Sequence, residues 1–173
     1  MSVAIVPVTI ALLDVEEKGA EALASALMVG APPEWPPEFN GPGYRRWQRS
    51  LLAADPDQSG FAGYYLIGDG QLVGTCGFKG PPDANGQVEV GYSVIAPRRR
   101  RGYASGAVAL LVEKAFADPR TTAILGETLA DGAASEGVLR RCGFEFVGTR
   151  TDDEDGKVMR FERRRPERRS ADL

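Results

Sequence analysis

The strongest constraint on the fold is an abrupt change of hydrophobic pattern at Gly102. Residues 87–95 (QVEVGYSVI) alternate in part between apolar and polar positions, which is typical of a β-strand. After Gly102 apolar residues recur at helical spacing until Asp118 and Pro119, where we expect the helix to end. Strand, arginine-rich turn and helix follow one another without a break. The pattern therefore predicts a crossover at the centre of a mixed α/β sheet.

Before the crossover the sequence predicts three strands and two helices. The strands are residues 3–8, 61–67 and 71–78, and a hairpin turn at residues 68–70 joins the last two. Asp14 and Glu17 resemble a capping box, which predicts a helix from there to about Met28. Five prolines and three glycines make residues 30–43 a long loop of the kind that often binds ligands. A helix is expected to follow at residues 44–54.

After the crossover we expect a strand at 121–129, a helix at 133–142, and a hairpin of strands 144–150 and 157–161. The chain of 173 residues fits one domain, which we place at residues 1–163. The arginine-rich tail, residues 164–173, is expected to be mobile. Its interleaved glutamates favour a solvated tail over contact with RNA.

The chain contains no histidine, which excludes more functions than any other feature of its composition. It excludes Ser-His-Asp and Cys-His nucleophiles, histidine general bases and histidine metal ligands. With Cys76 and Cys142 as the two cysteines, a zinc site is not expected either, and we predict no metal. Chemistry must then rest on carboxylates, hydroxyls, a thiol, backbone amides or a bound cofactor.

Location and partners are constrained by hydropathy and charge. No apolar run approaches the roughly 18 residues of a membrane-spanning helix, and the N-terminus lacks the features of a signal peptide. We therefore expect a cytoplasmic protein without a membrane partner. The net charge is -3, yet arginines cluster at residues 98–101 and 160–169. This pattern indicates local anion sites and argues against nucleic acid as a partner.

The arginine-rich turn before the central helix has the chemistry of an anion site. The first turn of a helix exposes unpaired amides at the positive end of its dipole, and Gly102 lets an anion approach the backbone. The four arginines at 98–101 add charge and paired hydrogen-bond donors. The turn matches neither a Walker loop nor GxGxxG, but these residues alone predict a pyrophosphate site.

Three motifs in this region resemble those of the GCN5-related N-acetyltransferases, the GNAT family. Residues 99–104 (RRRGYA) are similar to the family's R/Q-x-x-G-x-G/A motif, and residues 89–92 (EVGY) agree with the strand that precedes it. Residues 132–144 (GAASEGVLRRCGF) resemble N-x-x-S-x-x-V-L-x-x-x-G-F. The matches extend over residues 72–148. They are most similar to the branch that acetylates the N-termini of ribosomal proteins.

The resemblance implies the GNAT fold, a mixed, mostly antiparallel sheet of about seven strands flanked by about four helices. It also implies direct transfer of the acetyl group of acetyl-CoA to a primary amine, either a small molecule or a protein N-terminus. The residues that it implicates in cofactor binding are Val94, Arg99, Arg100, Arg101, Gly102, Tyr103 and Ala104. The backbone amide of Val94 would stabilise charge on the thioester oxygen.

Catalytic roles carried over from the family fall on two side chains. Glu89 would deprotonate the amine, directly or through water, unless it only pairs with a basic side chain on a neighbouring strand. Ser135 would protonate the leaving sulfur, unless it only caps its helix. Gly132 stands in place of the family's asparagine, and Leu139 in place of the tyrosine general acid of many members. Cys142 fits a buried filler better than a covalent nucleophile.

Further side chains are implied to contact the acceptor. Trp35 on the long loop and Tyr92 on the central strand would line its pocket. The alternative for Trp35, as for Phe39 and Tyr44, is to anchor the loop to the core. Glu127, near the end of its strand, would attract a cationic acceptor.

Competing functions of the same fold stay open at this point. A non-catalytic sensor would hold acyl-CoA without transfer, and Gly132 and Leu139 lend this alternative some support. A second enzyme alternative uses a longer acyl group. Release of the CoA thiol that depends on an amine separates catalysis from sensing. Because similar proteins are often dimers, a homodimer is also left open.

Overall fold

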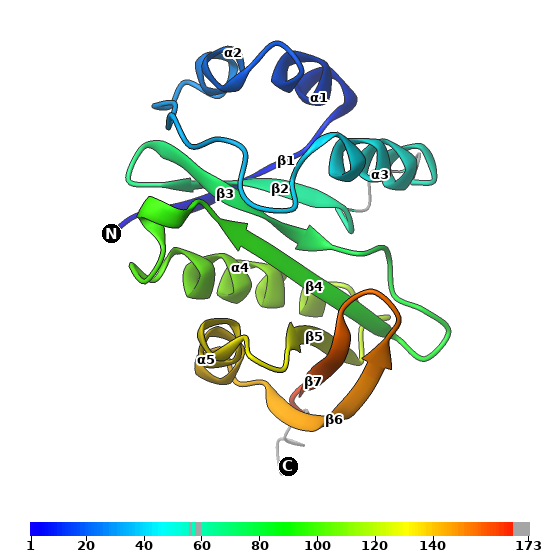
Figure 1. The fold of residues 1–173 in the computed structure, drawn as a ribbon. Coiled ribbons are helices and arrows are strands. Elements are labelled where there is room, and N and C mark those ends of the chain that lie inside the picture. Colours follow the sequence, from blue (N-terminus) through cyan, green and yellow to red (C-terminus); the bar gives the residue numbers. More distant parts are fainter. Residues whose placement is uncertain (56, 58–59, 168–173) are drawn as a thin grey trace, which may run out of the picture.

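A computed structural model of the chain describes residues 1–55, 57 and 60–167. Within these residues seven strands form one sheet in the order β1-β2-β3-β4-β5-β7-β6 (Figure 1). The strands are β1 (Val3–Pro7), β2 (Gly63–Gly68), β3 (Gln71–Phe78), β4 (Gln87–Val94), β5 (Ala123–Leu129), β6 (Glu145–Asp152) and β7 (Gly156–Arg164). Neighbouring strands are antiparallel except β4 and β5, which are parallel. The predicted mixed, mostly antiparallel sheet is confirmed.

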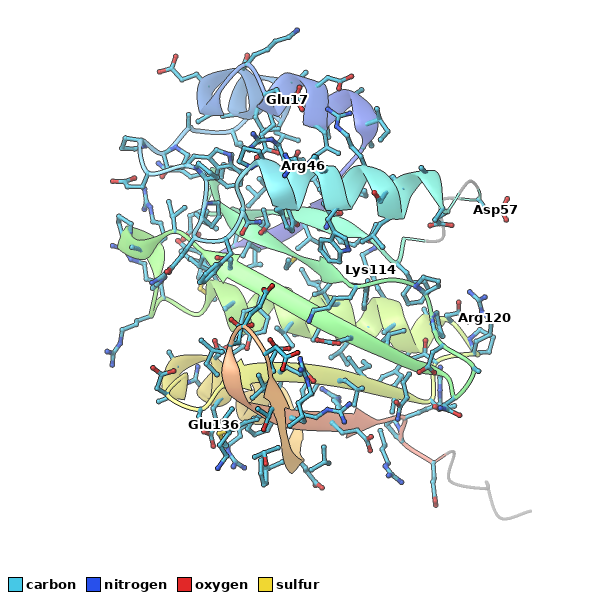
Figure 2. All side chains as sticks on the ribbon, turned by 45° about the vertical axis from the view of Figure 1, so that its right-hand side comes forward. Glu17, Arg46, Asp57, Lys114, Arg120 and Glu136 are labelled. Atoms are coloured by element: carbon cyan, nitrogen blue, oxygen red, sulfur yellow. The ribbon has the colours of Figure 1, made fainter. Side chains whose placement is uncertain are left out.

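Helices cover both faces of the sheet. The described residues form α1 (Ile10–Glu16), α2 (Ala20–Ala26), α3 (Pro42–Ala53), α4 (Tyr103–Ala117) and α5 (Ala133–Arg141). Figure 1 shows α1, α2 and α3 on one side and α4 and α5 on the other. Charged side chains such as Glu17, Arg46 and Arg120 point outward from these layers (Figure 2).

The predicted single helix over residues 14–28 is wrong, because two short helices replace it. Thr9 caps α1, and its hydroxyl accepts a hydrogen bond of 3.1 Å from the Leu12 amide. Gly19, with φ of 120°, then separates α1 from α2. Asp14 therefore lies inside α1 rather than at its start. The apolar pattern continues across the break because both helices pack on the same face of the sheet, which hides the break in the sequence.

The core lies on both faces of β2, whose six residues are all buried. Tyr64 and Leu66 belong to the larger apolar cluster, which includes the buried side of α4. Tyr65 and Ile67 point the other way and join a smaller cluster with residues of α1 and α2. The alternation follows from the period of two in a strand. It explains why this segment is apolar at nearly every position.

The two parallel strands separate part of the way along the sheet. Residues 87–90 of β4 pair with residues 123–126 of β5, and β4 then continues to Val94 along β3 alone. The last four residues of β4 therefore have one edge without a paired strand. This free edge faces the start of α5 and the turn before α4, and a cavity lies between these segments.

The described residues continue past the predicted domain boundary at residue 163. Arg164 belongs to β7, and the Arg165 guanidinium donates to the carbonyls of Phe116, Asp118 and Thr121 at 2.6–2.9 Å. Residues 168–173 of the predicted tail lie outside the described residues. No helix in the described part of the chain is long and apolar enough to cross a membrane.

Candidate active site

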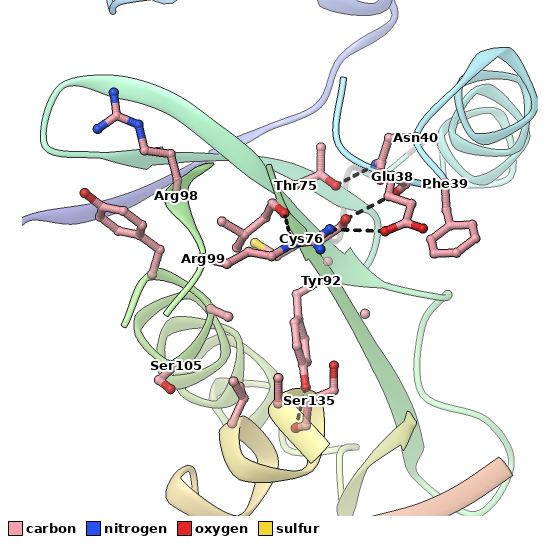
Figure 3. A pocket seen from close by; sticks show the side chains of 18 of the residues that line it. Glu38, Phe39, Asn40, Thr75, Cys76, Tyr92, Arg98, Arg99, Ser105 and Ser135 are labelled. Carbon is pink, nitrogen blue, oxygen red and sulfur yellow. Dashed lines mark hydrogen bonds and ion pairs between the residues drawn. The ribbon is translucent and has the colours of Figure 1, made fainter. Parts of the chain in front are cut away.

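A cavity of about 1070 Å³ opens along the free edge of β4 (Figure 3). The start of α4 and the start of α5 line one half of it. The loop before α3, α3 itself and the end of β3 line the other half. The cavity thus joins the turn predicted to bind a pyrophosphate to the long loop predicted to bind a ligand. These two segments are about sixty residues apart in the sequence.

The start of α4 leaves its amides available to the cavity. Gly102 is the N-cap with φ of 85°, a conformation that favours glycine, and no side chain caps the helix. The amides of the first helical turn have no carbonyl acceptor within the helix. Ala104 and Ser105 of that turn line the cavity. Small residues, open amides and the positive end of the dipole fit a pyrophosphate.

The arginines of the turn divide between structure and cavity. Arg99 Nε donates to the Val94 carbonyl at 2.9 Å, and its Nη2 contacts Glu38 Oε2 at 3.2 Å. Arg98 hydrogen-bonds the side chain of Gln71. The Arg100 guanidinium lines the cavity and has no hydrogen-bond partner in the described part of the chain, whereas Arg101 is absent from the lining.

Tyr103 is the first residue of α4, and its side chain anchors the helix to the β2–β3 hairpin. The ring is buried, and its hydroxyl donates to Asp69 Oδ2 at 2.7 Å. This carboxylate raises the pKa of Tyr103. A Cβ atom at Gly68 would lie 2.4 Å from the ring, so only glycine lets the β2–β3 hairpin approach it.

The Val94 amide points toward the cavity along the free edge of β4. The Ile95 amide donates to the Val73 carbonyl at 3.0 Å, so Ile95 faces β3 with its backbone groups. Backbone groups alternate along a strand, and those of Val94 therefore face the opposite edge. The Val94 carbonyl is occupied by Arg99, which agrees with this orientation. The amide is therefore directed to the side on which the family resemblance implies a donor.

Ser135 and Tyr92 connect α5 to β4 inside the cavity (Figure 3). Tyr92 Oη donates to the Ser135 carbonyl at 3.0 Å, and burial raises the pKa of this phenol to about 12. Gly132, not Ser135, is the N-cap of α5. The Ser135 hydroxyl has no hydrogen-bond partner among the residues that the structure describes. It is therefore available to a bound molecule.

Glu89 lies on the face of β4 that carries the long loop, and it forms an ion pair with Lys79. The Lys79 amide also donates to the Glu89 carbonyl at 2.9 Å. Lys79 lines the cavity, whereas Glu89 is absent from the lining. This is the pairing with a basic neighbour that the sequence leaves open. A Cβ atom at Gly91, the next residue on this face, would meet nothing within 4 Å.

Trp35 lies outside the cavity lining and packs against the smaller core cluster. Its Nε1 donates to Glu16 Oε1 at 3.1 Å, and Tyr65 Oη donates to Glu16 Oε2 at 2.9 Å. Burial raises the pKa of Glu16. This placement matches the alternative in which Trp35 anchors the long loop.

Glu127 is also outside the lining, on the part of β5 that pairs with β7. Both of its carboxylate oxygens accept hydrogen bonds from Arg150, at 2.7 and 2.9 Å. Arg160 adds an ion pair at 3.2 Å. Arg150 lowers the pKa of Glu127. The negative charge of Glu127 is thus already paired with arginines of β6 and β7.

Leu139 and Cys142 on and after α5 point away from the cavity. Leu139 is fully buried, and a Cβ atom on Gly126 of β5 would come within 2.6 Å of it. A hydroxyl at this position would face the core. The half-buried Cys142 thiol contacts the Ser105 carbonyl at 3.4 Å, and burial raises its pKa.

The structure adds cavity residues that the sequence analysis missed. Asn40 and Thr75 are buried, and Asn40 Nδ2 donates to Thr75 Oγ1 at 2.6 Å. Ser93 Oγ donates to the Glu38 carbonyl at 3.1 Å, and Trp47 of α3 also lines the cavity. A signal existed only for the loop as a whole. Which of its side chains turn inward depends on contacts with β3 and β4.

Comparison with protein families gives a match to the model described as Acetyltransferase (GNAT) domain over residues 8–145. The chain is 29% identical over 98 residues to the uncharacterized N-acetyltransferase YjdG of Bacillus subtilis (strain 168). This match covers 56% of the chain and 58% of YjdG. The chain therefore spans less than two thirds of this relative.

Solved structures share the fold at low sequence identity. RimL, a ribosomal L7/L12 alpha-N-protein acetyltransferase solved with coenzyme A, has a TM-score of 0.70 and 14% identity. That match covers 95% of this chain and 94% of RimL. The aminoglycoside acetyltransferase AAC(6')-Ib, solved with ribostamycin and coenzyme A, has a TM-score of 0.66 and 20% identity, covering 99% and 100% of the two chains.

Proposed function

The chain belongs to the GNAT acetyltransferase family, and we propose that it transfers the acetyl group of acetyl-CoA directly to a primary amine. The observation that carries the proposal is the cavity itself. It places an uncapped helix start and an arginine-rich turn beside a free strand edge, and it continues to a second half that can hold an acceptor. Acetyl-CoA, when bound, supplies the thioester.

Donor binding is assigned to the turn and the first turn of α4. The amides after Gly102, with Arg98 and Arg100 beside them, would bind the pyrophosphate. Arg99 would hold the turn in place against β4 through its hydrogen bond to the Val94 carbonyl. Arg101 and the Tyr103 side chain would contribute charge and anchoring rather than direct contact.

Transfer needs charge stabilisation and two proton movements. The Val94 amide would donate to the thioester oxygen, where negative charge develops as the nitrogen–carbon bond forms, and from which it passes to sulfur as the carbon–sulfur bond breaks. Glu89 would accept the proton of the ammonium through water, along the open space beside Gly91. Ser135 would donate a proton to the departing sulfur and would regain one, through water, from the nitrogen, which loses its second proton as the amide forms. Its hydroxyl lines the cavity without a partner among the described residues, which supports this role.

The acceptor we propose is a small-molecule amine or a protein N-terminus. The sequence motifs resemble those of enzymes that acetylate the N-termini of ribosomal proteins, which supports a protein N-terminus as acceptor. The shared fold is compatible with both kinds of acceptor. A cytoplasmic location and a homodimer remain predictions.

Amine-dependent release of the CoA thiol tests the proposed function. With acetyl-CoA and a panel of amines, free thiol should appear in proportion to the acetylated amine that forms, as measured by a thiol reagent and mass spectrometry. Binding of acetyl-CoA without amine-dependent release would instead leave an acyl-CoA-binding module. A faster rate with a longer acyl donor would identify a different acyltransferase.

A further inference from the structure

Charge is distributed unevenly around the cavity. Among the described residues that line it, Glu38 is the only carboxylate. The basic residues of the lining are Lys79, Arg98, Arg99, Arg100 and Arg141. A positive potential suits an anionic donor, but it repels an acceptor with several positive charges. The cavity thus offers a single attractive position to an ammonium group.

Glu38 is connected through a single side chain to Val94, whose amide is the proposed donor to the thioester oxygen. One guanidinium, that of Arg99, contacts both the Val94 carbonyl and Glu38 Oε2 (Figure 3). Ser93 of β4 binds the Glu38 carbonyl and thereby holds this part of the loop against the strand. Glu38 Oε1 has no hydrogen-bond partner within the described part of the chain. One ammonium can therefore bind there without displacing Arg99.

The rest of the acceptor half, lined by residues of 38–48 and 75–79, is aromatic or neutral. The rings of Tyr44 and Trp47 lie 5.9 Å apart and are tilted by 56°. Asn40 and Thr75 are buried and satisfy each other, so they offer no charge. Lys79 is held by Glu89. Aromatic walls bind apolar groups, and their ring faces attract an ammonium more weakly than a carboxylate does.

We propose that the acceptor is a monoamine with an aromatic or aliphatic group, that Glu38 binds its single ammonium, and that polycations are excluded. The inference rests on the proposed function and specifies its substrate class. Glu38 is thus assigned to acceptor binding, separately from the proton transfer proposed for Glu89.

Calorimetric titration of amines into the protein with saturating CoA tests the inference without requiring turnover. The probes are 2-phenylethylamine as a monoamine, and spermidine and kanamycin as polycations. We expect 2-phenylethylamine to bind at least about tenfold more tightly than either polycation, because the basic lining repels each further positive charge. Equal or tighter binding of a polycation, or binding of no amine, overturns the inference.

Matched variants locate the effect. Glu38→Gln should weaken binding of 2-phenylethylamine about tenfold. Glu34→Gln removes an exposed carboxylate from the same loop outside the cavity and should leave the affinity unchanged. Trp47→Ala should weaken 2-phenylethylamine and leave CoA affinity unchanged. An unchanged amine affinity in Glu38→Gln with intact CoA binding contradicts the inference alone, whereas failure of CoA to bind contradicts the proposed function as well.

Discussion

Arg99 donates a hydrogen bond of 2.9 Å to the backbone carbonyl of Val94. The bond ties the arginine turn before α4 to the free edge of β4, so a change in the turn moves the strand edge as well. The remaining guanidinium nitrogen reaches Glu38 on the long loop at 3.2 Å. One side chain thus links the three segments that meet at the cavity.

Arg99→Lys should impair function although it keeps the positive charge. A single ammonium cannot reproduce the planar guanidinium that contacts two acceptors in different directions. We expect kcat/KM for acetyl-CoA to fall about tenfold, as for the loss of one charged hydrogen bond. Arg101→Lys, outside the cavity lining, is the matched control and should behave as wild type in steady-state kinetics. Equal behaviour of the two variants would remove the linking role of Arg99.

Ser135→Ala should lower kcat and leave the KM for acetyl-CoA nearly unchanged. A proton donor that acts only on the departing sulfur contributes to the transition state, typically by about 10²-fold. Gly132 is the N-cap, so loss of the Ser135 hydroxyl should not destabilise α5. Single-turnover kinetics and thermal unfolding separate the two effects. A kcat within about twofold of wild type would show that Ser135 is not the acid.

Leu139→Ala should destabilise the protein and spare its chemistry. The side chain is fully buried against β5, and truncation of such a leucine lowers the free energy of unfolding by about 2–5 kcal/mol. Its direction away from the cavity predicts that kcat/KM is retained at temperatures where the variant is folded. Urea unfolding and steady-state kinetics provide the two measurements. Loss of activity without loss of stability would assign position 139 to the active site after all.

Glu16→Gln should reveal a pH dependence of stability that comes from the buried carboxyl. Burial raises the pKa of Glu16 in the folded state above the ordinary value of a glutamate, so the folded protein holds this proton more tightly than the unfolded chain. The stabilisation is therefore complete below the unfolded pKa and is lost as pH rises through the raised folded pKa. The difference in unfolding free energy, wild type minus Glu16→Gln, should be larger at low pH than at neutral pH.

Urea titrations at both pH values measure that difference, with Glu21→Gln on the exposed face of α2 as the control. The control variant should show no such change, because the Glu21 carboxylate is exposed in the folded protein. A difference for Glu16→Gln that stays constant with pH, or one that grows toward neutral pH, would contradict a raised pKa.

The fold class and the donor half of the site could be predicted because both depend on contiguous residues. The glycine, the arginines and the helix start at residues 98–104 are adjacent in the sequence, so they come together without any contact from the rest of the chain. The break at Gly19 could not be predicted, since both helices present apolar residues to one face. In the acceptor half, the long loop with Phe39 and Tyr44 was indicated by the sequence, whereas Glu38, Asn40 and Trp47 were missed. The positions of Glu38 and Asn40 depend on contacts with residues 35 to 61 positions away.

The most direct test of the account is the thermal stability of the protein with and without saturating acetyl-CoA. Ligand at 100 times its dissociation constant stabilises a protein by about 2.7 kcal/mol. For a domain of this size this should raise Tm by roughly 5–10 °C. CoA should produce a similar shift, whereas ATP and NAD should not.

Two glycine variants complete this measurement. Gly102→Ala and Gly156→Ala place alanine at φ of 85° and 72°, at a comparable backbone cost of roughly 1–2 kcal/mol. Gly102 lines the cavity, whereas Gly156 is the first residue of β7 and lies outside the cavity lining. The account predicts that Gly102→Ala alone loses the shift with acetyl-CoA. An absent shift in the wild-type protein, or an equal shift with ATP, would contradict the account.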